Sequence, residues 1–172
     1  MKLHPLLFTA FFAVILIYAC SKDDTNSSTT QLQIHLTDGP GDYQQVNVDI
    51  QEIRVKMSDD TSQWITIPAY AGVYNLLDFQ NGVDTLIAAG PVPPVQLKEL
   101  RLILGPNNTI MVDSVLHDLE TPSAEQSGLK IKVDKNLGLT LDSLTIDFDA
   151  KQSIVETGNG KFILKPVIRV KN

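Results

Sequence analysis

The stretch VNVDIQEIRVKM, residues 46–57, decides the fold class of this chain. Apolar residues fill every second position from Val46 to Ile50, and beyond Glu52 they resume one place out of phase, from Ile53 to Met57. Period-two alternation is typical of a β-strand with one buried face, and a single inserted residue is how a β-bulge appears in a sequence. The stretch therefore predicts a half-buried strand with a bulge near Glu52, or else two strands joined by a tight bend.

Shorter segments of the same kind recur on both sides of this stretch, with Gly, Pro and Asn between them. Strands at this spacing are typical of a β-sandwich or barrel, and helical periodicity is scarce except for a turn or two within 76–89. We therefore expect a single all-β, antiparallel, β-sandwich-like domain with little helix. Its further predicted strands are 32–36, 64–67, 73–77, 97–104, 109–112, 115–119, 129–133, 144–148 and 162–170.

Two turn signals add detail to this prediction. The segment GPNN, residues 105–108, is a cluster of turn-forming residues, so the strands on either side of it are expected to form a hairpin. Pro166 interrupts the last predicted strand. Because proline cannot donate to a β-ladder, that strand is expected at a sheet edge or at a bulge.

The N-terminal segment has the pattern of an export signal. A weakly basic head precedes an apolar run over residues 6–19, which is shorter than the about 20 residues that span a bilayer and is typical of a signal peptide, residues 1–19. Cys20 is the single cysteine, and IYAC, residues 17–20, resembles the bacterial lipobox. We therefore expect a diacylglycerol thioether on Cys20 that holds the chain on a membrane. An ordinary signal peptide, or an anchor helix, with a chance cysteine is the alternative.

Residues 20–31 are polar and carry no large apolar side chain before Leu32, so they are expected to form a flexible tether ahead of a β-sandwich domain over 32–172. The tether begins SKDD after Cys20, which resembles the acidic signal by which some Gram-negative bacteria display lipoproteins. This predicts an outer-membrane lipoprotein exposed at the cell surface. A merely solvated linker is the alternative.

The charge balance limits the partners. The chain has 14 basic and 20 acidic side chains and a net charge of −6, and removal of the signal peptide takes away one more basic residue, Lys2. An acidic domain is a poor match for nucleic acid, and it gives no general attraction to anionic headgroups. The expected membrane contact is therefore the lipid on Cys20, and no nucleic-acid partner is expected.

Several blocks of sequence resemble one known family. They lie in the same order as in the bacterial lipoprotein family called domain of unknown function 4382, and the resemblance runs from Leu32 to Val170. It implies an all-β cell-envelope domain and supplies no activity. Gly39 stands where alanine is more usual. The blocks are LTDGPGDY at 36–43, VNVDI at 46–50, RLILG at 101–105, TPSAEQSGLK at 121–130, DFDA at 147–150 and KPVIRV at 165–170.

Signals for catalysis are weak. Beyond the signal peptide there are two histidines, His35 and His117, each within a predicted strand, and no Gly-x-Ser-x-Gly sequence that would place a nucleophile. No zinc-binding spacing and no phosphate-binding glycine loop occurs. We therefore expect no enzyme, no catalytic residue and no cofactor, and a cryptic hydrolase is the alternative.

Two groups of residues are candidates for binding. Asp38 and Asp42 enclose Gly39-Pro40-Gly41 and are weak candidates for calcium, which takes six to eight oxygen ligands. The alternative is a turn whose aspartates cap backbone amides. Tyr70 and Tyr74 lie in a cluster of aromatic residues near predicted loops and are candidates to stack on a sugar. The alternative is that these rings pack in the core.

Together these observations predict a surface or envelope lipoprotein that acts as a non-catalytic binding or structural module. Its expected partner is a glycan or an envelope protein. A subunit of a surface fibre is a further alternative.

Overall fold

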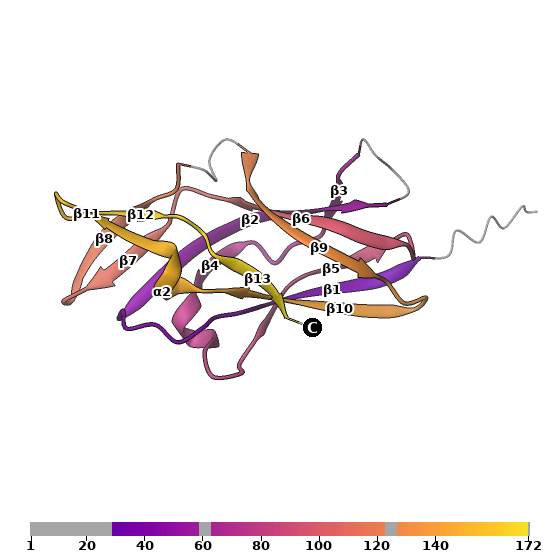
Figure 1. Ribbon diagram of the computed structural model, residues 1–172, viewed down its shortest axis with the longest axis horizontal. Coiled ribbons are helices and arrows are strands. Elements are labelled where there is room, and N and C mark those ends of the chain that lie inside the picture. The colour runs from indigo at the N-terminus through magenta and orange to yellow at the C-terminus, as the bar shows by residue number, and fades with distance from the viewer. Residues whose placement is uncertain (1–28, 59–62, 123–126, 172) are drawn as a thin grey trace, which may run out of the picture.

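The computed structural model describes residues 29–58, 63–122 and 127–171 (Figure 1). Strands dominate this part of the chain, which confirms the all-β prediction, and the two helices are single turns. The elements are β1 (Thr30–Thr37), β2 (Gln45–Met57), β3 (Ile65–Ile67), β4 (Gly72–Asn75), η1 (Leu76–Phe79), β5 (Thr85–Val92), β6 (Gln96–Leu104), β7 (Thr109–Val112), β8 (Val115–Glu120), β9 (Leu129–Asn136), β10 (Leu141–Phe148), α2 (Ala150–Ser153), β11 (Ile154–Thr157), β12 (Lys161–Leu164) and β13 (Ile168–Lys171).

The strands form two sheets around one apolar core. The smaller sheet has the order β13-β10-β1-β5, and the larger has the order β11-β12-β8-β7-β2-β6-β9, with β3 and β4 also paired to β2. Most strand pairs are antiparallel, as predicted, and the two exceptions are β1 with β10 and β8 with β12, which run parallel. Fully buried side chains from both sheets, such as Ile34 and Phe148 from the smaller and Ile53 and Leu100 from the larger, share one cluster.

Strand β2 lies in the middle of the larger sheet, and the predicted bulge is confirmed. Its pairing with β6 slips between Ile50 and Glu52, so the exposed Gln51 is the extra residue. The insertion keeps Ile50 and Ile53 on the buried face although they are an odd number of residues apart. A single bulged strand therefore replaces the alternative of two strands with a bend.

The predicted hairpin across residues 105–108 is wrong. Strands β6 and β7 pair with successive parts of β2 and both run antiparallel to it, so the chain continues in one direction through the turn-rich segment. The hairpin forms one strand later, between β7 and β8. Its tip residues Asp113 and Ser114 have φ values of 49° and 64°, as a two-residue type I′ turn requires.

The last predicted strand is split by Pro166 between the sheets. β12 pairs with β8 in the larger sheet, whereas β13 is an edge strand of the smaller one. At the other end of the domain, β1 begins at Thr30, so its first two residues fall within the predicted tether. Neither helix in the described ranges is long and apolar enough to cross a membrane.

Candidate functional site

Asp49 is the centre of a buried polar cluster beside the β2 bulge. Its side chain is 1 % exposed and accepts hydrogen bonds from the backbone N and the Nδ2 of Asn107, at 3.2 and 3.0 Å, and from Gln51 Nε2. Its backbone N donates to Asn108 Oδ1 at 2.9 Å, and its carbonyl accepts from Gly105 N at 2.8 Å. These bonds hold residues 105–108 against β2, which is why the segment does not reverse the chain.

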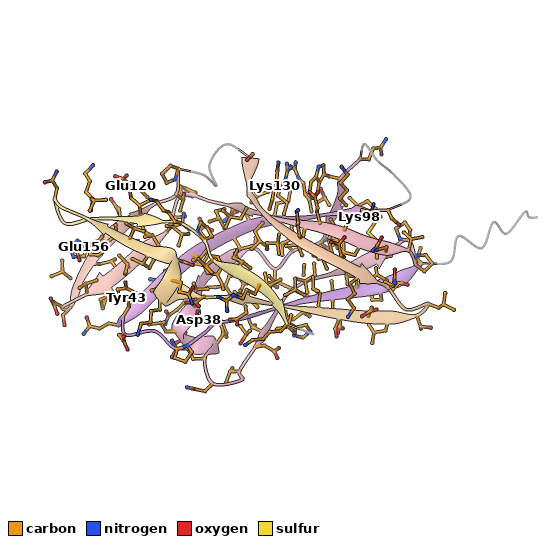
Figure 2. The ribbon with its side chains drawn as sticks, in the orientation of Figure 1. Asp38, Tyr43, Lys98, Glu120, Lys130 and Glu156 are labelled. Carbon is orange, nitrogen blue, oxygen red and sulfur yellow. The ribbon has the colours of Figure 1, made fainter. Side chains whose placement is uncertain are left out.

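Asp38 is the second buried aspartate and lies just beyond the end of β1 (Figure 2). Its Oδ1 accepts a hydrogen bond from Ala150 N at 2.8 Å, and its Oδ2 accepts one from Gln80 Nε2 at 3.3 Å. Burial raises the pKa of Asp38, and the nearby carboxylates of Asp147 and Asp149 raise it further, against the lowering effect of the two hydrogen bonds. The residue joins the loop after β1 to the helix that follows β10.

The calcium candidates Asp38 and Asp42 do not converge on one point. The Asp42 side chain is 86 % exposed and forms an ion pair with Lys151 at 2.8 Å, whereas Asp38 is turned to backbone and amide donors. Within the described ranges, no group of three or more His, Cys, Asp or Glu side chains is arranged to hold a metal ion. Asp38 does cap a backbone amide, as the alternative has it, but that amide is Ala150 N in α2 and not one within residues 38–42.

The two candidate tyrosines differ in their surroundings. Tyr70 is 57 % exposed, whereas Tyr74 is partly buried against the core, with its ring 6.3 Å from that of Phe79. The Tyr74 hydroxyl donates to the Tyr70 carbonyl, and burial raises the pKa of Tyr74. Only Tyr70 therefore offers an open ring, so the two residues do not form a paired sugar platform.

The histidines lie on different sheets. His35 Nδ1 is 2.6 Å from Asp84 Oδ1, and the His117 ring packs against Phe162 with centroids 5.0 Å apart. In the part of the chain that the structure describes, neither ring is hydrogen-bonded to a serine hydroxyl. The arrangement of a Ser–His nucleophile is therefore not present at either histidine.

A row of cationic side chains crosses the outer face of the larger sheet. Arg54 on β2 lies directly opposite Arg101 on β6, which lies directly opposite Lys130 on β9. In the neighbouring row Lys56 and Lys132 lie on either side of Glu99. We call the side chains of Arg54, Lys56, Arg101, Lys130 and Lys132 the basic face.

Arg101 is at the centre of the basic face and has an unusual environment. Its guanidinium carbon lies 4.1 Å from the centre of the Trp64 ring, and its Nε is buried without a hydrogen-bond partner among the described residues. Gly128, with φ of +72°, lies against the stem, because a Cβ there would come within 2.9 Å of Arg101 Cγ and 2.8 Å of the Leu102 carbonyl. Glycine thus permits the backbone to cover this side chain.

The basic face has no clear signal in the sequence, because its members are far apart in the chain. The local signals are two pairs of alternating cations, Arg54 with Lys56 and Lys130 with Lys132, and the strand register brings these pairs together around Arg101. Cys20, the predicted lipidation site, lies outside the described residues.

The comparisons with known proteins give a family and no activity. The family model described as "Domain of unknown function (DUF4382)" matches residues 29–166. No curated protein and no solved structure matches the chain significantly. The matched region contains all the strands from β2 to β12, both buried aspartates and the basic face. The chain therefore belongs to the DUF4382 family.

Proposed function

We propose that the protein is a lipoprotein of the bacterial outer membrane, displayed at the cell surface, that acts as a non-catalytic binding module. A lipid on Cys20 holds it, and residues 21–29 connect the lipid to the folded domain. Ten residues of extended chain reach at most about 35 Å. The domain therefore works within a short distance of the membrane and can present its loops and sheet faces to a partner.

The observation that carries this proposal is the exposed apolar surface at the end of the domain where β1 begins. Gln31 N donates to the Thr140 carbonyl at 3.0 Å, and Thr30 Oγ1 donates to the Gly138 carbonyl, so the start of β1 is fixed to the β9–β10 loop. That loop carries Leu139, which is 76 % exposed, and next to it is Leu141, which is 58 % exposed. Exposed leucines beside the tether suit the end of the molecule that faces a lipid surface.

The opposite end of the domain is far from the start of β1. The β7–β8 and β11–β12 hairpins lie at the left in Figure 1, and β1 begins at the right. A domain held by one end leaves its far end and both sheet faces accessible, which favours a binding role.

The strand arrangement weighs against the fibre-subunit alternative. β1 is paired on both sides, by β10 and by β5, so removal of an N-terminal strand would divide the smaller sheet. The edges of the sheets also carry features that oppose strand addition: β5 contains Pro91, and β9 carries Lys130 and Lys132.

Protease treatment of intact cells tests the proposal, with wild type and Cys20→Ala compared. We expect the wild-type protein to be in the membrane fraction and to be digested from outside, and the Cys20→Ala protein to leave the membrane fraction. Protection of the wild type in cells whose other surface lipoproteins are digested would place the domain in the periplasm and refute display. Retention of Cys20→Ala in the membrane would refute the lipid anchor.

A further inference from the structure

The basic face is positively charged although the whole chain is acidic. The net charge is −6, yet five cations lie on adjacent strands of this face, with Glu52 and Glu99 in the same cross-strand rows and exposed Asp134 further along β9. Glu52 is engaged by Arg54, whose Nε donates to it at 2.8 Å. Within the described ranges, Arg101, Lys130 and Lys132 form no ion pair. In the described part of the chain, no carboxylate is therefore within ion-pair distance of these three central cations, although Glu99 is their neighbour on β6.

This arrangement does not favour the folded state. Like charges directly opposite one another on neighbouring strands are destabilising, and Arg101 has a cation opposite it on both sides. Its buried Nε also lacks an acceptor, which costs free energy. The cation–π contact with Trp64 offsets part of this cost. A residue that is unfavourable for the fold at the centre of a charged face indicates a role in binding.

Protection of a sheet edge explains only part of the basic face. Lysines on an edge strand prevent pairing with another chain, and β9 is an edge strand that carries two of them. Arg101 is different, because β6 lies between β2 and β9 and has no free edge along these residues. Edge protection therefore gives no reason for a guanidinium at this position.

We propose that the basic face binds an acidic polysaccharide, with Arg101 at the centre of the contact. A guanidinium forms two parallel hydrogen bonds with a carboxylate, sulfate or phosphate group, and the cations on adjacent strands, about 5 Å apart, match the repeated anions of a polymer. Trp64, next to Arg101, adds an apolar ring surface suited to a sugar.

Two other anionic partners fit less well. The overall negative charge of the chain disfavours a long, rigid duplex that extends beyond the basic face more than a flexible polysaccharide that contacts the basic face alone. Membrane headgroups would have to reach the side of the sandwich, where Lys130 lies (Figure 2), although the chain meets its tether at the end that carries Leu139. This inference rests on the proposed binding function and names the ligand class for it.

Binding of the full-length lipoprotein in neutral detergent to immobilised polymers tests the inference. We expect binding to polygalacturonate or dextran sulfate, and not to neutral dextran, with affinity that falls as salt is raised. The two anionic polymers distinguish carboxylate from sulfate as the recognised group. The double variant Arg101→Met/Lys130→Gln is expected to bind about tenfold more weakly or worse, while its denaturation midpoint stays equal to or above that of the wild type.

The matched control is Arg169→Met/Lys165→Gln, which removes the same two kinds of cation from positions outside the basic face. It is expected to bind like the wild type. An equal loss in both double variants, or no binding to either anionic polymer, would overturn the inference. So would tighter binding to immobilised duplex DNA, or loss of polymer binding when phosphatidylglycerol, but not phosphatidylcholine, is added to the micelles. Because this assay uses purified protein, its failure is distinct from a failure of the cell-surface experiment.

Discussion

Among the residues that the structure describes, two aspartates are buried: Asp49, which is 1 % exposed, and Asp38, which is 2 % exposed. Their neighbours differ. Asp49 lies among amide donors from Gln51 and Asn107 and bonds through both side chain and backbone. Asp38 receives two hydrogen bonds and has the carboxylates of Asp147 and Asp149 nearby. Asp49 ties the loop 105–108 to β2, and Asp38 ties the loop after β1 to the start of α2.

The difference shows that burial alone does not decide what a carboxylate contributes. Around Asp49 each oxygen has a donor, and removal of the carboxylate would leave those donors without a partner inside the protein. Around Asp38 the charged form is opposed by burial and by two like charges, which raises its pKa. Asp49 should therefore stabilise the fold strongly, whereas the effect of Asp38 should depend on pH.

The largest expected effect is that of Asp49→Ala. The change leaves Asn107 N, Asn107 Nδ2 and the Gln51 amide without their acceptor and weakens the attachment of residues 105–108 to β2, although the backbone bonds of residue 49 remain. We therefore expect a loss of about 2–4 kcal/mol in the free energy of unfolding. Urea denaturation followed by tryptophan fluorescence measures it. Asp118→Ala, at an exposed position on β8, is the matched control and should change the value by less than about 0.5 kcal/mol.

Gly105→Ala disturbs the same cluster by a steric clash. A Cβ at Gly105 would lie 2.3 Å from Asp49 Oδ2 and 2.7 Å from Asp49 Cγ. It should destabilise the protein in the same direction. If both Asp49→Ala and Gly105→Ala behaved like the Asp118 control, the Asp49 cluster would not be what holds residues 105–108 against β2.

The Asp49 cluster also shows what the sequence predicts and what it does not. Alternation with one slip is a local signal, so the strand and its bulge at Gln51 followed from residues 46–57 alone. The residues 105–108 carry an equally strong turn signal, yet β6 and β7 stay in line, because side chains of Asn107 and Asn108 bond to Asp49 across the sheet. Local turn chemistry was overridden by a contact between residues almost sixty positions apart.

Strand β5 was missed for a related reason. It contains Ala88, Ala89, Gly90 and Pro91, which have low β-propensity, and the sequence placed a turn or two of helix within 76–89, of which η1 is the observed part. The small residues serve a close approach, since a Cβ at Gly90 would lie 2.8 Å from Pro68 Cδ. Pairing with β1 fixes this segment as a strand.

The candidate sites depended even more on tertiary register. Tyr70 and Tyr74 are close in sequence, but only Tyr70 is exposed, because it lies in the segment between β3 and β4, whereas Tyr74 lies on β4 and packs against Phe79 and the core. Arg54, Arg101 and Lys130 are distant in sequence and adjacent in space. No composition or spacing rule would have placed these three together without the pairing of β2, β6 and β9.

A smaller effect, with a characteristic pH dependence, is expected for Asp38→Asn. The folded pKa of Asp38 is raised above its ordinary value of 3.8, so its contribution to stability is fully present below that value and is lost as the pH rises through the raised pKa. Asparagine keeps an oxygen for Ala150 N and carries no charge. Relative to the wild type, the variant should therefore become more stable as the pH rises from about 4 to 7, as measured by denaturation midpoints.

Asp142→Asn provides a control of opposite sign. Burial alone would raise the pKa of Asp142. Hydrogen bonds from Lys135 Nζ and from Gly138 N outweigh burial, so the pKa is lowered overall. Its stabilising contribution is present above the ordinary pKa and is lost as the pH falls, so this variant should lose stability relative to the wild type as the pH rises. If the stability of Asp38→Asn and of Asp142→Asn, each relative to the wild type, changed with pH in the same direction, the opposite pKa shifts assigned to these two carboxylates would be wrong.

The smallest expected effect is that of Asp42→Asn, although Asp42 belongs to the same loop as Asp38. The ion pair with Lys151 raises the pKa of that lysine, mainly through the hydrogen bond, so its linked stability is lost only at alkaline pH, above the ordinary lysine value of 10.5. At neutral pH water and salt screen an exposed pair of this kind. We expect no measurable change in the denaturation midpoint of the variant, and no shift of the wild-type midpoint when calcium is added. A calcium-dependent rise that Asp42→Asn abolishes would instead make the loop a cation site and would require Asp38 to turn away from Ala150.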